Sequence, residues 1–295
     1  MLDCVGQTPL LELKSLSKPQ AKVYAKAEFM NPSGSVKDRA AKAMIVDGIK
    51  SGLLTKGKTI LDATSGNTGI ALAMIGASLG YPIKLYLPAN ASFERKAALK
   101  AYGAEVIETD PLEGSDGALL AARQEFKSRP TRYFYPDQYS NEANPKAHYE
   151  STGVEIWEQT GGKVTHFVAI MGTSGTFTGT TKRLKDYNPK LKAIAVQPDS
   201  PFHGIEGTKH MASTIKPAFY DEALADDTIE VGTEEAYALA RHLASKEGLF
   251  VGISAAANAL AASRLAGALR EEALIVTVLC DSGMRYAGEA FWSKT

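Results

Sequence analysis

The chain has 295 residues, with 33 basic and 33 acidic side chains and therefore a net charge of zero. This balance excludes a global field that would attract nucleic acid or an anionic membrane, so any anion site must be built locally. Hydrophobic residues make up 44% and charged residues 22%, which is ordinary for a soluble globular protein of one or two domains.

Strand-like and helix-like patterns alternate from residue 58 onward. A Gly-rich turn separates the first strand from an apolar helix that ends at Gly80. Ser92 is expected to cap a later helix, which Gly103 ends. This first run predicts strands over 58–63, 82–88 and 105–108, and helices over 68–81, 92–103 and 117–128.

Strand-like and helix-like patterns alternate again after residue 164. Thr233 is the expected N-cap of an amphipathic helix in this second run. Repeated strand–helix–strand units favour parallel sheets covered by helices on both faces, and thus two three-layer α/β/α lobes. The break between the runs lies within 129–149, which is rich in Pro, Asn and Tyr. The second run predicts strands over 165–172, 191–198 and 273–280, with helices after residue 172 and over 233–248 and 254–269.

The two cysteines, Cys4 and Cys280, give neither a disulfide framework nor paired metal-ligand spacing. They favour a reducing compartment, and we expect the cytoplasm. The N-terminus has no basic segment followed by a long apolar core, so no signal peptide is predicted. We expect no metal site.

Three turns rich in small residues follow predicted strands: "ATSGNTG" (63–69), "MGTSGTFTG" (171–179) and "VGISAAA" (251–257). Small residues let a ligand approach the backbone, and free N–H groups at a helix start favour an anion. A single turn of this kind is more often a tight turn with helix capping. The second turn is the best candidate for a phosphate, because its run offers five hydroxyls, on Thr173, Ser174, Thr176, Thr178 and Thr180.

The segment "NPSGSVKDR" (31–39) places Lys37 where turn residues give way to a helix-like pattern. Most lysines are solvated, and spacing alone does not distinguish this one. Pyridoxal phosphate is nevertheless a candidate ligand, because it needs a phosphate cup, a partner for its ring nitrogen and a lysine amine for its aldehyde. No P-loop is present, so a nucleoside triphosphate is disfavoured.

Several motifs occur in an order that resembles the cysteine synthase family of fold-type-II pyridoxal phosphate enzymes. The resemblance runs from "VGQTPL" to "CDSGMRY" and covers nearly the whole chain. It implies the tryptophan synthase β-like fold. Two long segments are most similar to the cysteine synthase B (O-acetylserine sulfhydrylase B) branch. The motifs are "NPSGSVKDRAA", "ATSGNTGIALAMIGASLGY", "ERKAALKAYGAE", "AHYESTGVEIWEQTGGKVTHFVAIMGTSGT" and "EGLFVGIS".

The resemblance assigns roles to individual residues. Lys37 would bond to the cofactor aldehyde, and Asn67 would donate to the 3′-oxygen of the ring. The cofactor phosphate would be bound by Gly172, Thr173, Ser174, Gly175 and Thr176, and the substrate carboxylate by Thr64, Ser65, Asn67, Thr68 and Gln138.

The partner of the pyridine nitrogen stays open between Ser254, Asp281 and Ser282, with Ser254 slightly ahead of Asp281. A serine leaves the ring nitrogen largely unprotonated, which suits β-elimination, whereas a carboxylate would protonate it.

The implied reaction is β-replacement on O-acetyl-L-serine by sulfide or thiosulfate, giving L-cysteine, with Lys37 removing the α-proton. This is a transferase of cysteine biosynthesis. The alternatives are an O-phosphoserine sulfhydrylase, a cystathionine β-synthase, a serine/threonine dehydratase or a non-catalytic binding paralogue.

The resemblance also implies a homodimer that acts on small molecules and binds neither nucleic acid nor membrane. We expect a smaller, mobile lobe over 39–140 that carries the carboxylate loop. The larger, cofactor-binding lobe would comprise 1–38 and 141–295. Segment 203–211, "HGIEGTKHM", is either a discriminator of substrates or a solvated loop.

Overall fold

A computed structural model describes residues 1–64 and 66–293 of the chain. The chain divides into two compact units, each of which is considered separately. The smaller unit comprises Met1–Val5 and Lys37–Asn144, and the larger unit comprises Gly6–Val36 and Pro145–Thr295.

The smaller unit is built on a four-stranded sheet in the order β5-β4-β3-β6. Every pair of neighbouring strands in it is parallel, so each connection must cross over the sheet. Three connections are helical, which explains the strand–helix rhythm of this part of the sequence. The strands are β3 (Thr59–Ala63), β4 (Ile83–Pro88), β5 (Glu105–Thr109) and β6 (Tyr133–Phe134).

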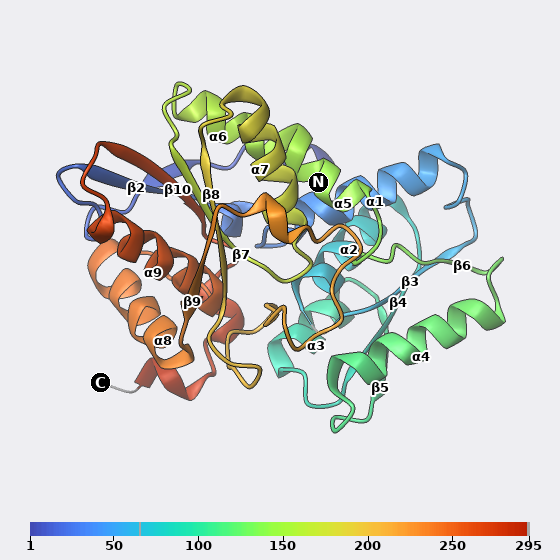
Figure 1. Ribbon diagram of the computed structural model, residues 1–295. Helices are drawn as coiled ribbons and strands as arrows, with labels where there is room; N and C mark the ends of the chain where they lie inside the picture. The colour runs from blue at the N-terminus through green and yellow to red at the C-terminus, as the bar shows by residue number, and fades with distance from the viewer. Residues whose placement is uncertain (65, 294–295) are drawn as a thin grey trace. The chain divides into compact units, whose positions relative to one another are not determined.

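Helices cover both faces of the smaller sheet (Figure 1). One core cluster joins the sheet to α1 (Lys37–Lys50), α2 (Asn67–Leu79) and α3 (Phe93–Ala101). A second cluster joins the opposite face to Ala118 and Ala122 of α4 (Gly114–Ser128). The short helix α5 (Ala143–Ala147) then carries the chain into the larger unit.

The larger unit contains a six-stranded sheet in the order β1-β2-β10-β7-β8-β9. The β1–β2 pair is antiparallel and the remaining neighbouring pairs are parallel. The strands are β1 (Leu10–Glu12), β2 (Ala21–Lys26), β7 (His166–Ile170), β8 (Lys192–Pro198), β9 (Asp227–Val231) and β10 (Ala273–Val278).

Two pairs of helices cover the larger sheet (Figure 1). The pair α8 (Thr233–His242) and α9 (Ile253–Ala268) packs against one face through an alanine-rich surface. The pair α6 (Gly153–Gln159) and α7 (Gly175–Tyr187) packs against the other face. The predicted fold, two three-layer α/β/α units with largely parallel sheets, is confirmed.

The sequence predictions missed three strands of the larger sheet, β1, β2 and β9. Strand β9 forms one edge of the sheet, and most of its side chains are exposed. Because an edge strand hydrogen-bonds on one side and faces solvent, its sequence "DTIEV" lacks the apolar run used to find the central strands.

The two predicted helix caps had different outcomes. Ser92 caps α3, since its Oγ accepts a hydrogen bond from the Arg95 backbone N–H at 3.5 Å. The prediction for Thr233 is wrong, because Gly232 is the N-cap of α8 and Thr233 is the first helical residue. The Thr233 hydroxyl instead accepts a hydrogen bond from the Gly204 backbone N–H at 2.9 Å.

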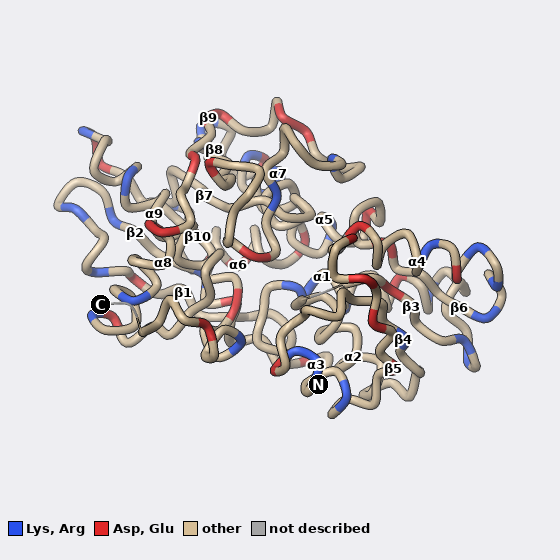
Figure 2. The backbone as a smooth tube through the Cα atoms, turned by 90° about the horizontal axis from the view of Figure 1, so that it is seen from below, with Lys and Arg blue, Asp and Glu red and all other residues tan. Residues whose placement is uncertain are grey.

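Basic and acidic residues are interspersed along the backbone of both units (Figure 2). This mixing agrees with the zero net charge of the whole chain. Across residues 1–64 and 66–293, no helix is both long enough and apolar enough to span a bilayer.

Helix α7 approaches its neighbour so closely that a glycine is required at the contact. A Cβ atom on Gly179 would lie 1.9 Å from the Pro145 carbonyl oxygen and 2.9 Å from the His148 Cβ. We expect Gly179→Ala to lower the free energy of unfolding by about 1–3 kcal/mol, because a backbone atom has to move.

The matched control is Gly267→Ala in α9, where a Cβ atom would meet nothing within 4 Å. Alanine should stabilise that helix by up to about 1 kcal/mol. Denaturant unfolding of both variants provides the measurement, and equal effects would refute the packing argument.

Candidate functional site

The segment before Lys37 is held firmly within the larger unit. The Asn31 amide donates to Glu28 Oε2 at 2.8 Å, and Asn31 Oδ1 accepts from the Gly6 N–H at 2.9 Å. Val36 N–H donates to the Cys280 carbonyl oxygen at 2.8 Å. These bonds fix the backbone from which α1 starts, and so fix the position of its first residue.

Lys37 is that first residue of α1. Its side chain is partly exposed, whereas the next two side chains, Asp38 and Arg39, are only 0% and 3% exposed. Lys37 is therefore the most exposed of the first three residues of α1.

The carboxylate loop, residues 64–68, joins β3 to α2 in the smaller unit. Thr64 Oγ1 accepts a hydrogen bond from the Gly66 N–H at 3.3 Å, and Asn67 is the first residue of α2. The N-cap residue, Gly66, has no side chain to bond the first N–H groups of the helix. Such N–H groups suit an anion. Ser65, also predicted here, lies outside the described residues.

Gln138 is brought to the carboxylate loop from 70 positions further along the chain. Thr68 Oγ1 donates to Gln138 Oε1 at 2.7 Å, and both residues are buried. The Gln138 carbonyl oxygen accepts a hydrogen bond from Asn144 Nδ2 at 2.7 Å, which fixes the segment. The structure thus brings together two of the residues predicted to bind one carboxylate.

Asp62 was missed by the sequence reasoning. It lies in β3, two positions before the carboxylate loop begins, and it is 1% exposed. Burial raises the pKa of its carboxyl group to about 7, and the negative charge of Asp137 acts in the same direction. A buried strand position gives no sequence signal that separates such an acid from a solvated one.

The phosphate loop, residues 172–176, joins β7 to α7 in the larger unit. A Cβ atom on Gly172 would lie 2.2 Å from the Gly207 carbonyl oxygen, so the two backbones touch. Ser174 has a left-handed backbone with φ of 63° and is 2% exposed. Its Oγ has no hydrogen-bond partner within the described part of the chain.

This arrangement fits a bound phosphate. A buried hydroxyl without a partner is costly, and an anion at the start of α7 would accept its hydrogen bond. Thr173 and Thr176 are the other hydroxyls at this helix start. Thr178 and Thr180 lie further along α7, so the sequence overcounted the hydroxyls of the loop.

The candidates for the ring-nitrogen partner differ in the hydrogen bonds that their side chains already make. Asp281 is fully buried, and its Oδ2 accepts a hydrogen bond from the Tyr286 hydroxyl at 2.8 Å. Ser282 Oγ accepts from the Met284 N–H at 3.2 Å. Ser254, in the first turn of α9, is 7% exposed and makes no side-chain hydrogen bond to the described residues.

Segment 203–211 is attached directly to the phosphate loop. The Lys209 N–H donates to the Met171 carbonyl oxygen at 2.9 Å, next to the contact between Gly207 and Gly172. Burial lowers the pKa of His203, and the nearby His210 acts in the same direction. Among the described residues, no group of three or more His, Cys, Asp or Glu side chains is placed to hold a metal ion.

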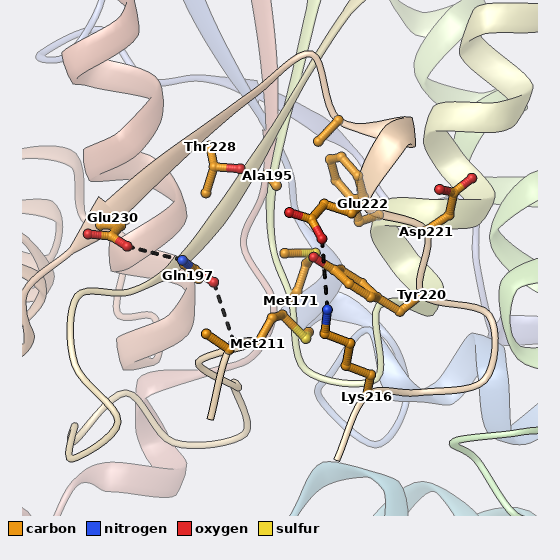
Figure 3. Close-up of a pocket in the computed structure, with 13 residues that line it drawn as sticks. Met171, Ala195, Gln197, Met211, Lys216, Tyr220, Asp221, Glu222, Thr228 and Glu230 are labelled. Carbon is orange, nitrogen blue, oxygen red and sulfur yellow. Dashed lines mark hydrogen bonds and ion pairs between the residues drawn. The ribbon is translucent and has the colours of Figure 1, made fainter. Parts of the chain in front are cut away.

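A pocket of about 530 Å³ adjoins this segment at Met211 (Figure 3). Gln197 spans its wall, donating to Glu230 Oε1 at 3.1 Å and accepting from the Met211 N–H at 3.4 Å. None of the predicted site residues lines it. Met171, which lines the pocket, directly precedes Gly172 of the phosphate loop, so the pocket adjoins that loop along the chain.

Comparisons with known proteins agree on one family. The sequence model of the family "Pyridoxal-phosphate dependent enzyme" matches residues 1–281. The cysteine synthase of Aquifex aeolicus is 52% identical over 99% of this chain and 92% of that protein. Cysteine synthase B of Pseudomonas aeruginosa is 43% identical over 96% of this chain and 94% of that protein. The crystal structure of cysteine synthase from Entamoeba histolytica has a TM-score of 0.95 at 34% identity, covering 100% of this chain and 90% of that one.

The raised pKa of Asp62 predicts a pH-dependent stability. The folded pKa of about 7 lies above the unfolded value near 3.8, so between these pH values the folded state holds one more proton. The free energy of unfolding should therefore fall as pH rises through this range, by about 1.4 kcal/mol per pH unit relative to Asp62→Asn. Urea unfolding at several pH values measures the difference, and parallel pH profiles would contradict it.

Proposed function

Because this chain belongs to the family of pyridoxal-phosphate dependent enzymes, we propose that it replaces the acetoxy group of O-acetyl-L-serine with a sulfur nucleophile. The product is L-cysteine, and the sulfur donor is sulfide or thiosulfate. The observation that carries this proposal is identity of 52% and 43% to two cysteine synthases over nearly the full length of the chain.

In this proposal, each polar end of the cofactor has its own binding residues. The cofactor phosphate would bind at the start of α7, where the buried Ser174 hydroxyl has no partner among the described residues. Asn67 would donate to the ring oxygen, and the Lys37 amine would hold the aldehyde carbon. When bound, pyridoxal phosphate supplies an electron sink for negative charge at the substrate α-carbon.

Ser254 is the residue that we assign to the ring nitrogen. Its hydroxyl makes no side-chain hydrogen bond to the described residues, whereas Asp281 already accepts one from Tyr286. A neutral hydroxyl donates to the nitrogen without protonating it fully, and this favours elimination at the β-carbon.

The substrate carboxylate binds at the carboxylate loop. The backbone N–H groups at the start of α2, including those of Asn67 and Thr68, and the hydroxyl of Thr64 are neutral donors, which stabilise an anion without a buried cation. The Thr68 hydroxyl donates to Gln138 Oε1 and so orients the Gln138 Nε2–H group as a further donor. Binding here fixes the α-carbon, so that the Lys37 amine removes the α-proton and later returns it.

The organisation of the chain around this reaction is also part of the proposal. We assign 39–140 to the lobe that carries the carboxylate loop, and 1–38 with 141–295 to the cofactor lobe. These lobes differ from the two compact units at residues 1–5, 37–38 and 141–144, which belong to the smaller unit. We infer a homodimer, in keeping with the family. The cytoplasm suits a chain whose two cysteines, Cys4 and Cys280, are both free thiols.

Removing the Lys37 amine tests the catalytic assignment. Lys37→Ala should abolish cysteine formation and the yellow colour of the purified protein, because both depend on that amine. Lys50→Ala is the matched control, since Lys50 is an exposed lysine at the other end of α1. An unchanged rate in Lys37→Ala would refute the mechanism.

The substrate is identified by the same assay with three amino acids. O-acetylserine should support cysteine formation faster than O-phosphoserine or serine. A faster rate with either of the others would reassign the enzyme to one of the alternative activities.

The phosphate loop is tested by two hydroxyl deletions in one region of the larger unit. Ser174→Ala should raise the dissociation constant of pyridoxal phosphate by roughly 10- to 100-fold, as expected for a lost hydrogen bond to a charged group. The cofactor-free variant should be no less stable than the parent, because the deleted hydroxyl has no partner there. Fluorescence titration and urea unfolding measure the two effects.

Thr181→Val is the control for this pair of effects. Thr181 Oγ1 is also buried without a partner, but it lies in the second turn of α7, away from the phosphate loop. Its deletion should leave the cofactor dissociation constant unchanged. Equal losses of cofactor binding in both variants would mean that Ser174 does not contact the phosphate.

A further inference from the structure

The two oxygens of the buried Asp62 carboxyl group differ in their hydrogen bonding. Its Oδ1 accepts a hydrogen bond from the Ala63 N–H at 2.8 Å, whereas its Oδ2 has no partner among the described residues. An ionised carboxylate needs several donors when it is buried. One short-range donor is insufficient, so the environment of Asp62 favours the protonated form.

The ionisable groups around Asp62 come from two elements of the smaller unit. Tyr135, Asp137 and Tyr139 belong to the segment after β6, and the negative charges of Asp62 and Asp137 disfavour each other. Helix α4 contributes Asp116, which acts on Tyr139, and Arg123, whose guanidinium lies 3.7 Å from Asp137 Oδ1. Arg123 is therefore engaged by Asp137 and does not neutralise Asp62.

This arrangement places Asp62 beside the carboxylate loop on two sides. Along the chain, Asp62 precedes Thr64 by two residues. Across the sheet edge, Asp137 and Tyr139 flank Gln138, and both interact electrostatically with Asp62. Gln138 in turn accepts the hydrogen bond of Thr68. A charge on Asp62 would thus act on both segments that form the anion site, since one follows it in the chain and the other carries Asp137 and Tyr139.

We propose that Asp62 is a positioning residue that admits the substrate carboxylate only while it is protonated. The inference rests on the proposed function, because it takes the Thr68–Gln138 pair as part of the carboxylate site. Loss of the Asp62 proton puts a buried negative charge near an incoming anion. Substrate binding then weakens, while the chemical step at the α-carbon is unaffected.

The raised pKa of Asp62 agrees with this geometry, because it places the loss of the proton in a pH range where the enzyme can be assayed. Burial first, and Asp137 second, raise the pKa of Asp62 to about 7. The protonated fraction therefore falls between about pH 6 and pH 8. Substrate binding should become weaker across this interval as the pH increases.

The test measures the dissociation constant of L-alanine from the holoenzyme at pH 6 and at pH 8. The visible absorbance of the bound cofactor reports the binding. L-alanine has the α-carboxylate but no β-leaving group, so it reports on binding alone. Asp62→Asn imitates the protonated acid. The dissociation constant of the parent divided by that of Asp62→Asn should be near one at pH 6. At pH 8 this ratio should be about 10, as expected for one nearby buried charge. Using this ratio cancels the pH dependence of the alanine amine.

Two further variants keep the outcome decisive. Asp47→Asn changes an exposed acid of the same unit and should match the parent at both pH values. Asp137→Asn removes the neighbouring negative charge, so the midpoint of the pH transition should move to lower pH even if Asp62→Asn does not fold. A ratio that is the same at pH 6 and pH 8, or an unmoved midpoint, would overturn the proposal.

Steady-state kinetics with O-acetylserine separates this inference from the proposed function. At pH 8, Asp62→Asn should lower KM and leave kcat unchanged. Absence of turnover in the parent enzyme would refute the proposed function, whereas the alanine ratio would still report on Asp62. A change in kcat with constant KM would refute the positioning role.

Discussion

The structure depends on a constraint that acts at every helix start: the first N–H groups of an α-helix need acceptors. Helix α3 satisfies one of them with its own serine. In α2, α7 and α9 the N-cap residue makes no such side-chain bond, although Thr173 Oγ1 accepts from the Gly175 N–H of α7 at 3.4 Å. All three follow turns of small residues in parallel-sheet units. The protein therefore leaves donors open at the places where the proposed phosphate, carboxylate and ring contacts are made.

The sequence predicted the parts of this arrangement that are local. The turns at 63–69 and 171–179 stand between a buried strand and a helix, and both are where they were expected. The resemblance to cysteine synthases is confirmed by 52% and 43% identity to two of them over nearly the full length of the chain. The individual site assignments stay predictions, although the bond between Thr68 and Gln138 agrees with their shared role.

Other features could not be predicted, for identifiable physical reasons. Asp62 looks like any acid near a strand end, because its burial depends on how segment 135–139 covers it. Strand β9 is polar because it lies at a sheet edge. The Thr233 cap was misassigned because its hydroxyl serves Gly204, which is 29 residues away. Each of these depends on contacts between distant segments, and such contacts leave no local pattern.

The contact between Gly172 and Gly207 also limits how segment 203–211 can change. The Gly207 carbonyl oxygen occupies the space that a Cβ atom on Gly172 would need, so the two segments pack main chain against main chain. Within the segment, Ile205 and Met211 are buried and Gly207 has a φ of 76°. Substitutions are therefore tolerated best at exposed positions such as Glu206. A change that moves the backbone at Gly207 would reach the start of α7 directly through the main chain.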